Sequence, residues 1–160
     1  MIKRYLTIAC LGLFALASFA CSKPALYGTT QESESVVKYY SVPPKQAFRA
    51  AKEALHYLGY SIKQEDPQKL FLETYWQPAT ADSHYVEVFG RRDYGTVGAY
   101  YRVVILIKSR ANGSSLKITN VAKSIISNVK SSNREEDKIV SKINDFTRRR
   151  DIQVTNIGLQ

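Results

Sequence analysis

The chain has 160 residues, of which 44% are hydrophobic, and its formal net charge is +9. Its length excludes an array of several full-sized domains, and its two cysteines exclude a disulfide-rich scaffold. The positive balance favours acidic partners, such as anionic lipid head groups, cell-wall polymer or an acidic protein surface.

The first twenty residues are typical of an export signal. Lys3 and Arg4 precede an apolar run from Leu6 to Ala20, which is too short to favour a stable membrane span. We therefore expect residues 1–20 to be removed as a signal peptide. The formal charge then falls from +9 to +7, because both cations leave and every acidic residue stays. Nucleic acid is not an expected partner of such an exported chain.

The residues around the expected cleavage site resemble the lipobox of bacterial lipoproteins. In that pattern Leu, a small residue and Gly or Ala precede the modified cysteine; Ala20 and Cys21 fit it, whereas Ser18 and Phe19 depart from it. The resemblance implies that Cys21 is lipidated and anchors the protein in a membrane. Because Ser22 rather than Asp follows, it implies the periplasmic face of the outer membrane. The alternative is an ordinary small-x-small cleavage, which would release a soluble periplasmic protein.

Residues 21–35 are predicted to form the lipidated cysteine and a flexible tether. The stretch from Ser22 to Ser35 is polar, with Pro, Gly and repeated Ser, Thr and Glu. A coil of this length reaches on the order of 20 Å, enough to lift a domain off a membrane. One globular domain is expected over residues 36–160. Cys10 would leave with the signal, so this domain has no cysteine for an internal disulfide.

The first elements of the domain are a strand and a helix. Residues from Val36 to Val42 are rich in β-branched and aromatic types, which favour a strand. Pro44 suits the first turn of a helix, and Gly59 suits its C-terminal cap. An apolar stripe at helical spacing predicts that the helix runs to about Leu58. The stripe consists of Phe48, Ala51, Leu55 and Leu58.

The middle of the domain is predicted to be an antiparallel meander. Pro67 lies between two strand-like stretches and predicts a hairpin turn, and Asn112-Gly113 predicts a second one. A long loop over residues 90–98 is expected to join another strand pair. The predicted strands are Tyr60–Glu65, Leu70–Gln77, Tyr85–Phe89, Ala99–Ser109 and Leu116–Ile126.

A second helix is expected from about Asn133. One apolar face supports it, formed by Ile139, Val140, Ile143 and Phe146. Asn133 and Glu136 resemble a capping box, and the arginines at 148–150 are expected in the last turn. A final strand is expected up to Val154. The order of strand, helix, antiparallel strands and helix predicts an α+β fold with both helices on one face of the sheet.

A family resemblance covers the first part of this domain. The segments Ser41-Val42-Pro43-Pro44, Gln46-Ala47-Phe48-Arg49-Ala50-Ala51 and Leu58-Gly59-Tyr60 resemble the helix-grip domains of the lipoprotein C component of the outer-membrane β-barrel assembly machine. The similarity covers roughly Val36 to Gln77, with vaguer support to Arg150, and its motif is a packing pattern. This chain has one such domain where that family has two. The resemblance implies a helix-grip-like fold and an envelope setting, and it transfers no binding site.

The sequence offers little for catalysis, and we expect no enzyme. His56 lies in a predicted helix and His84 in a polar loop, without a catalytic partner at a characteristic spacing. Glu73 and Glu87 are strand carboxylates that would have to face each other for glycoside hydrolysis; solvent-facing sheet charges explain them more simply. Neither a metal site nor a cofactor is expected, because the domain lacks Cys, HxH, HExxH and an acidic cluster.

Two surface features are candidates for binding a partner. The 90–98 loop combines three glycines with Arg91, Arg92 and Tyr94, residue types that are enriched at interfaces. A flexible hairpin with solvated charges is the alternative. Aromatic residues on the predicted strands are the second feature, since alternation points some of them away from a one-sided core. They are Tyr39, Tyr40, Tyr75, Trp76, Tyr85, Tyr100 and Tyr101.

These patterns favour a noncatalytic, membrane-anchored envelope lipoprotein. It would act as a scaffold or accessory subunit of an envelope protein complex, with outer-membrane protein assembly as one setting. Tethering would raise its effective concentration around membrane partners. The alternative is a periplasmic carrier or sensor for a lipid, glycan or other ligand, bound in a tyrosine-lined cavity between sheet and helix. A periplasmic hydrolase would require paired carboxylates in a cleft.

Overall fold

The computed structural model describes residues 26–94 and 99–155. The predicted signal peptide and Cys21 lie outside these residues. In the part of the chain that is described, no helix is long and apolar enough to cross a bilayer.

A large antiparallel sheet forms the centre of the domain. Its strands follow the path β1-β9-β8-β4-β3, with β2 also paired to β9 and β5 to β8. β8 pairs over its whole length with Gly113–Lys123 of β9, and the two strands join through a two-residue turn at Ala111 and Asn112. The strands are β1 (Thr29–Glu32), β2 (Val36–Tyr40), β3 (Ile62–Asp66), β4 (Phe71–Thr74), β5 (Gln77–Pro78), β8 (Tyr100–Arg110) and β9 (Gly113–Ser124).

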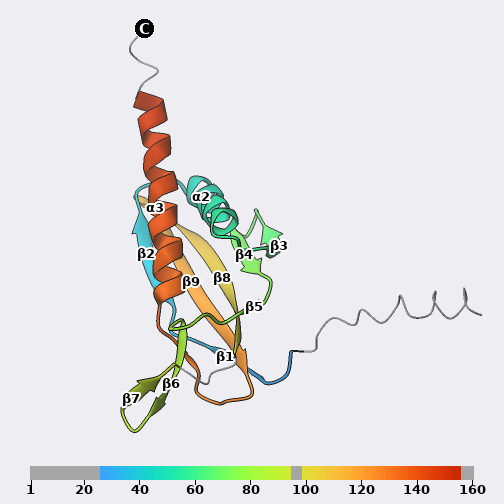
Figure 1. Cartoon of the computed structure of the whole chain (residues 1–160). Coiled ribbons are helices and arrows are strands. Elements are labelled where there is room, and N and C mark those ends of the chain that lie inside the picture. Colours follow the sequence, from blue (N-terminus) through green and yellow to red (C-terminus); the bar gives the residue numbers. More distant parts are fainter. Residues whose placement is uncertain (1–25, 95–98, 156–160) are drawn as a thin grey trace, which may run out of the picture.

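Two helices cover one face of this sheet (Figure 1). They are α2 (Pro44–Tyr57) and α3 (Arg134–Thr155). Apolar residues of α2, α3 and the inward-facing positions of β8 and β9 meet in one core, in which Leu55, Ile105, Ile118 and Ile143 are inaccessible to solvent. The α+β class and the placement of both helices on one sheet face are confirmed, as are α2 and the β3–β4 and β8–β9 hairpins.

The predicted meander is wrong in its middle part. β6 (His84–Val88) does not pair with β8; it pairs with β7 (Arg91–Asp93) and β10 (Lys130–Ser131) in a separate three-stranded sheet. The 90–98 segment therefore begins with a strand. A two-residue turn between Val88 and Arg91 needs fewer ordered residues than the nine-residue loop that was expected.

The N-terminal tether is shorter than predicted, because β1 lies within residues 21–35. Thr29–Glu32 pairs with Val121–Ser124 of β9. The Gln31 side chain strengthens this attachment: its nitrogen donates to the Ile126 carbonyl at 3.0 Å, and its oxygen accepts the Val129 N–H at 2.8 Å. Composition alone predicted a flexible coil here. It does not distinguish a coil from an exposed edge strand, because polar residues suit both.

The C-terminal segment is helical where a strand was predicted. α3 continues to Thr155, so the strand ending at Val154 is wrong and the arginines at 148–150 do not occupy the last turn. No Gly or Pro interrupts residues 134–155, and extending a formed helix by one residue is favourable. The capping box is also absent: the Asn133 N–H donates to Ser131 Oγ at 3.0 Å, and Glu136 accepts the Ser131 hydroxyl at 3.0 Å.

The domain has two distinct ends. At the end that we call proximal, the chain reaches β1 at Thr29, opposite Ser124, and the β6–β7 hairpin projects from the same end (Figure 1). At the distal end, Tyr40 pairs with Ser114, and α2 begins shortly afterwards. β9 runs from the distal to the proximal end over 12 residues. At about 3.3 Å per residue this separates the two ends by roughly 36 Å.

Candidate functional site

The β6–β7 hairpin carries the residues that the sequence singled out. Val88 pairs with Arg91, which leaves Phe89 and Gly90 as the two turn residues. Their φ angles are +49° and +73°, the left-handed pair that two-residue hairpin turns of type I′ require. Such turns favour Asn or Asp followed by Gly, so Phe89 is an unusual residue for its position. Its side chain has a relative exposure of 101%.

The three predicted partner-binding residues differ in their surroundings. The guanidinium of Arg92 lies 4.7 Å from the centroid of the Tyr85 ring, and the Tyr94 ring lies 5.6 Å from the same ring. Tyr85 is buried, so Arg92 and Tyr94 brace the hairpin against it. Arg91 is exposed beside Phe89. The tip therefore presents an aromatic ring with an arginine next to it, while residues 95–98 of the predicted loop lie outside the described residues.

An ion pair secures the base of the hairpin. Lys130 on β10 donates to the Glu87 carboxylate at 2.8 Å and lowers its pKa. Gly90 and Glu87 line the same pocket as Gln31 of β1 and Asn128, with a volume of about 630 Å³. The hairpin, β1 and the segment between β9 and β10 are therefore neighbours at the proximal end.

Two further apolar side chains lie at this end. Tyr27 and Ile125 have relative exposures of 79% and 80%. Gly28 brings their segments together: a Cβ at this position would lie 2.2 Å from the carbonyl carbon of Ser124, so only glycine permits the approach. With Phe89, these are the three most exposed large hydrophobic side chains of the described residues.

A groove of about 880 Å³ lies at the distal end. The N-terminus of α2 forms one side and the β3–β4 turn forms the other. Its rim is charged: Lys45 and Arg49 are exposed, and Lys52 pairs with Glu65 at 2.7 Å. Its apolar lining consists of Pro43, Pro44, Phe48, Pro67 and Leu70.

The aromatic residues that were predicted on strands divide into exposed and buried rings, although Tyr75 and Trp76 lie in the connection between β4 and β5 and not on a strand. Tyr39, Tyr75 and Tyr100 are exposed, whereas Tyr85 and Tyr101 are buried. Tyr40 and Trp76 are half-buried. Two of the more accessible rings lie next to an arginine: Arg110 is 4.2 Å from the Tyr39 centroid and Arg102 is 4.8 Å from that of Trp76.

The structure does not bring the candidate catalytic carboxylates together. Glu73 lies on the large sheet, where it contacts Arg102 and Lys63. Glu87 lies on the small sheet and pairs with Lys130. Among residues 26–94 and 99–155, no three His, Cys, Asp or Glu side chains are placed to hold a metal ion.

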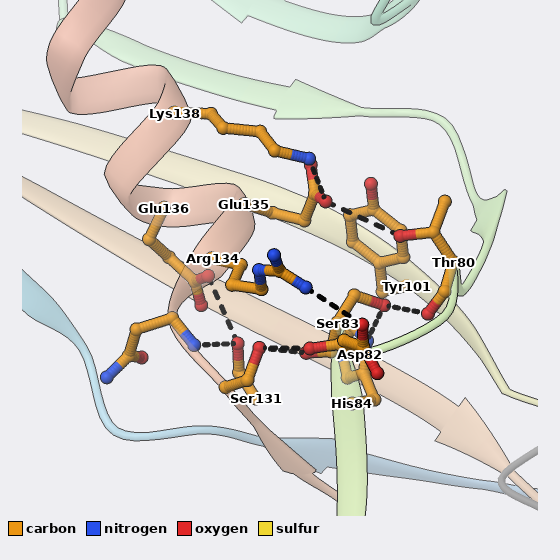
Figure 2. A network of polar contacts seen from close by, with 12 residues as sticks. Thr80, Asp82, Ser83, His84, Tyr101, Ser131, Arg134, Glu135, Glu136 and Lys138 are labelled. Carbon is orange, nitrogen blue, oxygen red and sulfur yellow. Dashed lines mark hydrogen bonds and ion pairs between the residues drawn. The ribbon is translucent and has the colours of Figure 1, made fainter. Parts of the chain in front are cut away.

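Sequence reasoning missed a buried polar network at the start of α3 (Figure 2). His84 is the first residue of β6 rather than part of a polar loop, and it is 1% exposed. Its Nδ1 lies 2.9 Å from Ser83 Oγ, and its Nε2 lies 3.1 Å from Asn120 Oδ1. Burial lowers the pKa of His84 and raises that of Glu136. No local pattern could have indicated this pairing, because Asn120 is 36 residues away.

A second set of contacts occupies the space between α3 and the sheet. The Tyr60 hydroxyl donates to Glu135 at 3.0 Å and lies 3.0 Å from the Tyr101 hydroxyl. Burial raises the pKa of Tyr101 to about 12. Lys138 donates to Glu135 at 2.8 Å. The alternative of a periplasmic carrier expected a tyrosine-lined cavity between sheet and helix. Tyr60 and Tyr101 lie in this region, and their hydroxyl groups contact protein groups.

Comparison with known proteins gives likenesses of shape alone. No family model matches the chain, and no curated protein matches it. The crystal structure of Ara h 8.0201 is similar with a TM-score of 0.48 at 8% identity, over 75% of this chain and 99% of that one. A putative uncharacterized protein from Rhizobium leguminosarum is similar with a TM-score of 0.39 at 9% identity, over 76% of this chain and 97% of that one. Neither likeness bears on function.

Proposed function

We propose that this protein is a noncatalytic, membrane-anchored lipoprotein of the bacterial envelope. It serves as a scaffold or accessory subunit of an envelope protein complex, with outer-membrane protein assembly as the setting that the resemblance of its first helix implies. The observation that carries the proposal is the distal groove, because it lies at the opposite end of the domain from the segment that leads to Cys21.

This arrangement separates anchoring from recognition. An acyl chain on Cys21 holds the proximal end at the membrane, and β9 spans the distance to the distal end. The groove is then presented roughly 36 Å farther into the periplasm. Confinement to the membrane raises the effective concentration of the groove around membrane complexes, so a modest intrinsic affinity suffices.

The chemistry of the groove defines the partner segment. Proline, phenylalanine and leucine side chains line it, which favours apolar side chains in the segment that binds. Lys45 and Arg49 stand on one rim, while the Glu65 carboxylate on the other is paired with Lys52. The net positive rim favours an apolar segment flanked by Asp or Glu. We assign it to an envelope protein.

The absence of catalysis in this proposal is supported by how the ionisable groups are engaged. Glu73 and Glu87 each contact cations on separate sheets. His84 is buried between Ser83 and Asn120, out of reach of a substrate in solvent. His56 is exposed on α2.

Charge reversal on the rim tests the proposal. The double variant Lys45→Glu and Arg49→Glu of the full-length protein is crosslinked in cells and purified from solubilised membranes. Recovery of the partner is expected to fall about tenfold or more, because the rim then repels acidic residues. Lys108→Glu on β8, an exposed reversal outside the groove, is the matched control. Mass spectrometry of the N-terminus reports acylation of Cys21.

Either of two results would overturn the proposal. An unmodified Cys21 in a soluble chain removes the anchor. A partner set that is unchanged in the double variant, at a melting temperature equal to that of the Lys108→Glu control, removes the groove.

A further inference from the structure

The proximal end of the domain is close to the membrane whenever Cys21 is acylated. Four residues separate Cys21 from Leu26, the first described residue, and β1 begins at Thr29. Five Cα–Cα steps reach at most about 18 Å in any conformation. The domain itself is roughly 36 Å long between its two ends. Its orientation on the bilayer is therefore constrained, in contrast to that of a domain on a fourteen-residue tether.

The most exposed apolar side chains lie at this same end. Phe89, Ile125 and Tyr27 have relative exposures of 101%, 80% and 79%. They come from the β6–β7 turn, the segment after β9 and the segment before β1. The pocket that Gly90 lines with Gln31 and Asn128 places the turn beside β1 and the segment after β9, and the close approach of Gly28 to Ser124 places the segment before β1 beside Ile125. Aromatic rings are enriched at the interface between lipid and water.

Phe89 is a poor choice for its turn in a protein that contacts only water. It has φ +49°, a left-handed conformation that disfavours bulky side chains, and no packing offsets this cost. Asn or Asp would adopt the left-handed conformation of this turn more readily and would expose a polar side chain to water. Arg91 stands next to it, exposed, and Arg92 follows on the same strand. An apolar tip with cations behind it fits the boundary between acyl chains and anionic head groups.

We propose that the β6–β7 hairpin inserts Phe89 into the interface of an anionic phospholipid bilayer, with Arg91 on the head groups and with Tyr27 and Ile125 resting on the surface beside it. The inference rests on the proposed anchoring at Cys21, which places this end at the membrane. The hairpin fixes the direction in which the distal groove points. Arg91, which the sequence singled out for a protein partner, would thus meet lipid.

Fluorescence quenching tests the insertion in the acylated full-length protein. Trp76 is the only tryptophan, so Trp76→Phe gives a silent background, into which Phe89→Trp is introduced. The protein is reconstituted in vesicles of phosphatidylethanolamine and phosphatidylglycerol whose acyl chains carry bromine. Strong quenching of the tryptophan at position 89 is expected. Tyr39→Trp in the same background, an exposed aromatic on β2 near the distal end, is expected to stay unquenched.

A second measurement uses the soluble chain without residues 1–21, so that no acyl chain contributes. Flotation with the same vesicles is expected, and Phe89→Asn is expected to lower the bound fraction about tenfold. Because Asn suits the left-handed turn, this variant is expected to fold, and its melting temperature provides the check. Arg91→Glu is expected to lower binding about fivefold, with loss of the dependence on anionic lipid.

The outcomes separate this inference from the proposed function. Acylated protein with equal quenching at positions 89 and 39 overturns the insertion and leaves the scaffold in place. An unmodified Cys21 overturns the anchor, while flotation of the soluble chain still decides whether the hairpin binds lipid. A photoreactive residue at position 89 that crosslinks to a protein instead of lipid also overturns the inference, because the hairpin is then a protein-binding element.

Discussion

The buried Asn120 side chain joins two ionisable residues of opposite type. The Asn120 side-chain oxygen lies 3.1 Å from His84 Nε2. On its other side the Asn120 amide is close enough to Glu136 to lower the pKa of the Glu136 carboxyl. The Asn120 nitrogen and Glu136 Oε1 nevertheless form no direct hydrogen bond. The amide can also be turned over. Its oxygen then faces a protonated Glu136, and its nitrogen donates to His84 in the other tautomer. The Ser83 hydroxyl fits both arrangements: it donates to His84 Nδ1 in the first, and in the second it accepts from Nδ1–H and donates to the Thr80 carbonyl.

This network makes stability depend on pH through Glu136. Burial raises the folded-state pKa of its carboxyl above the ordinary value of 4.5, so the folded state binds the proton more tightly than the unfolded state. The contribution of the protonated Glu136 carboxyl to the free energy of unfolding is complete at pH values below its ordinary pKa, and it is lost as the pH rises through the folded-state pKa. Glu136→Gln, which mimics the protonated carboxyl, is expected to raise the melting temperature by a few degrees at about pH 7.5.

The comparison with the unmodified protein across pH isolates this effect. The gain from Glu136→Gln is expected to shrink toward zero as the pH approaches the ordinary carboxyl pKa of 4.5. The lowered pKa of His84 removes stability below about pH 6.5 in both proteins, so only its coupling to Glu136 through Asn120 contributes to the difference. A gain that stays constant between these acidic and neutral conditions, followed by circular dichroism, would show that ionisation of Glu136 is not its source.

Single glycines decide the geometry of the turns between elements. Gly113 begins β9 with φ +125°, and a Cβ there would lie 2.0 Å from the Tyr40 carbonyl oxygen of the neighbouring strand. Gly59 follows α2 with φ +81°, and no atom lies within 4 Å of its built Cβ. The two positions share a left-handed backbone but differ in their surroundings.

Substitution at these glycines separates backbone strain from steric contact. Gly59→Ala is expected to lower the free energy of unfolding by about 1 kcal/mol, the cost of a left-handed alanine. Gly113→Ala is expected to cost about 3 kcal/mol or more, since β2 must also move away from β9. Urea denaturation measures both. Equal losses in the two variants would contradict the close approach of β2.

Elements with local signals were predicted well from the sequence. Pro44, the apolar stripe and Gly59 defined α2 almost to the residue, and Pro67 and Asn112-Gly113 located two hairpins. The β6–β7 sheet was missed, because β10, which completes it, comes from residues 130 and 131. The tip of the candidate hairpin was missed for a related reason: Arg91, Arg92 and Tyr94 were visible as residue types, but the exposure of Phe89 depends on the turn.

At the scale of the whole molecule, the proposed anchor at one end of the domain and the proposed recognition groove at the other imply a fixed orientation, because the connection to Cys21 is short. Neither end alone was evident in the sequence, because each combines segments that are far apart in the chain. The pocket at the proximal end unites residues 31 and 32, 87 and 90, and 128–130, Gly28 lies against Ser124, and the distal groove unites residues 43–52 with 65–70. Periodicity reports on single elements and carries no information about which of them meet.

Lengthening the connection is expected to abolish this orientation. Ile125→Cys provides the one free thiol of the mature protein, because the thiol of acylated Cys21 is blocked. A membrane-impermeant maleimide is expected to label it slowly in reconstituted protein. Insertion of about twenty Gly and Ser residues before Leu26 allows the domain to leave the surface, so labelling is expected to accelerate several-fold. Tyr39→Cys, exposed near the distal end, is the control and is expected to react rapidly with either connection. Equally fast labelling of Ile125→Cys before the insertion would contradict a fixed orientation.

The pairing of β1 with the end of β9 also sets the order in which the chain can fold. Val129 and Ser131 donate to side chains that lie 98 residues earlier, so β1 has no partner until these late residues are present. In the proposed lipoprotein the N-terminus emerges first, so Cys21 would be acylated before β1 can close onto β9.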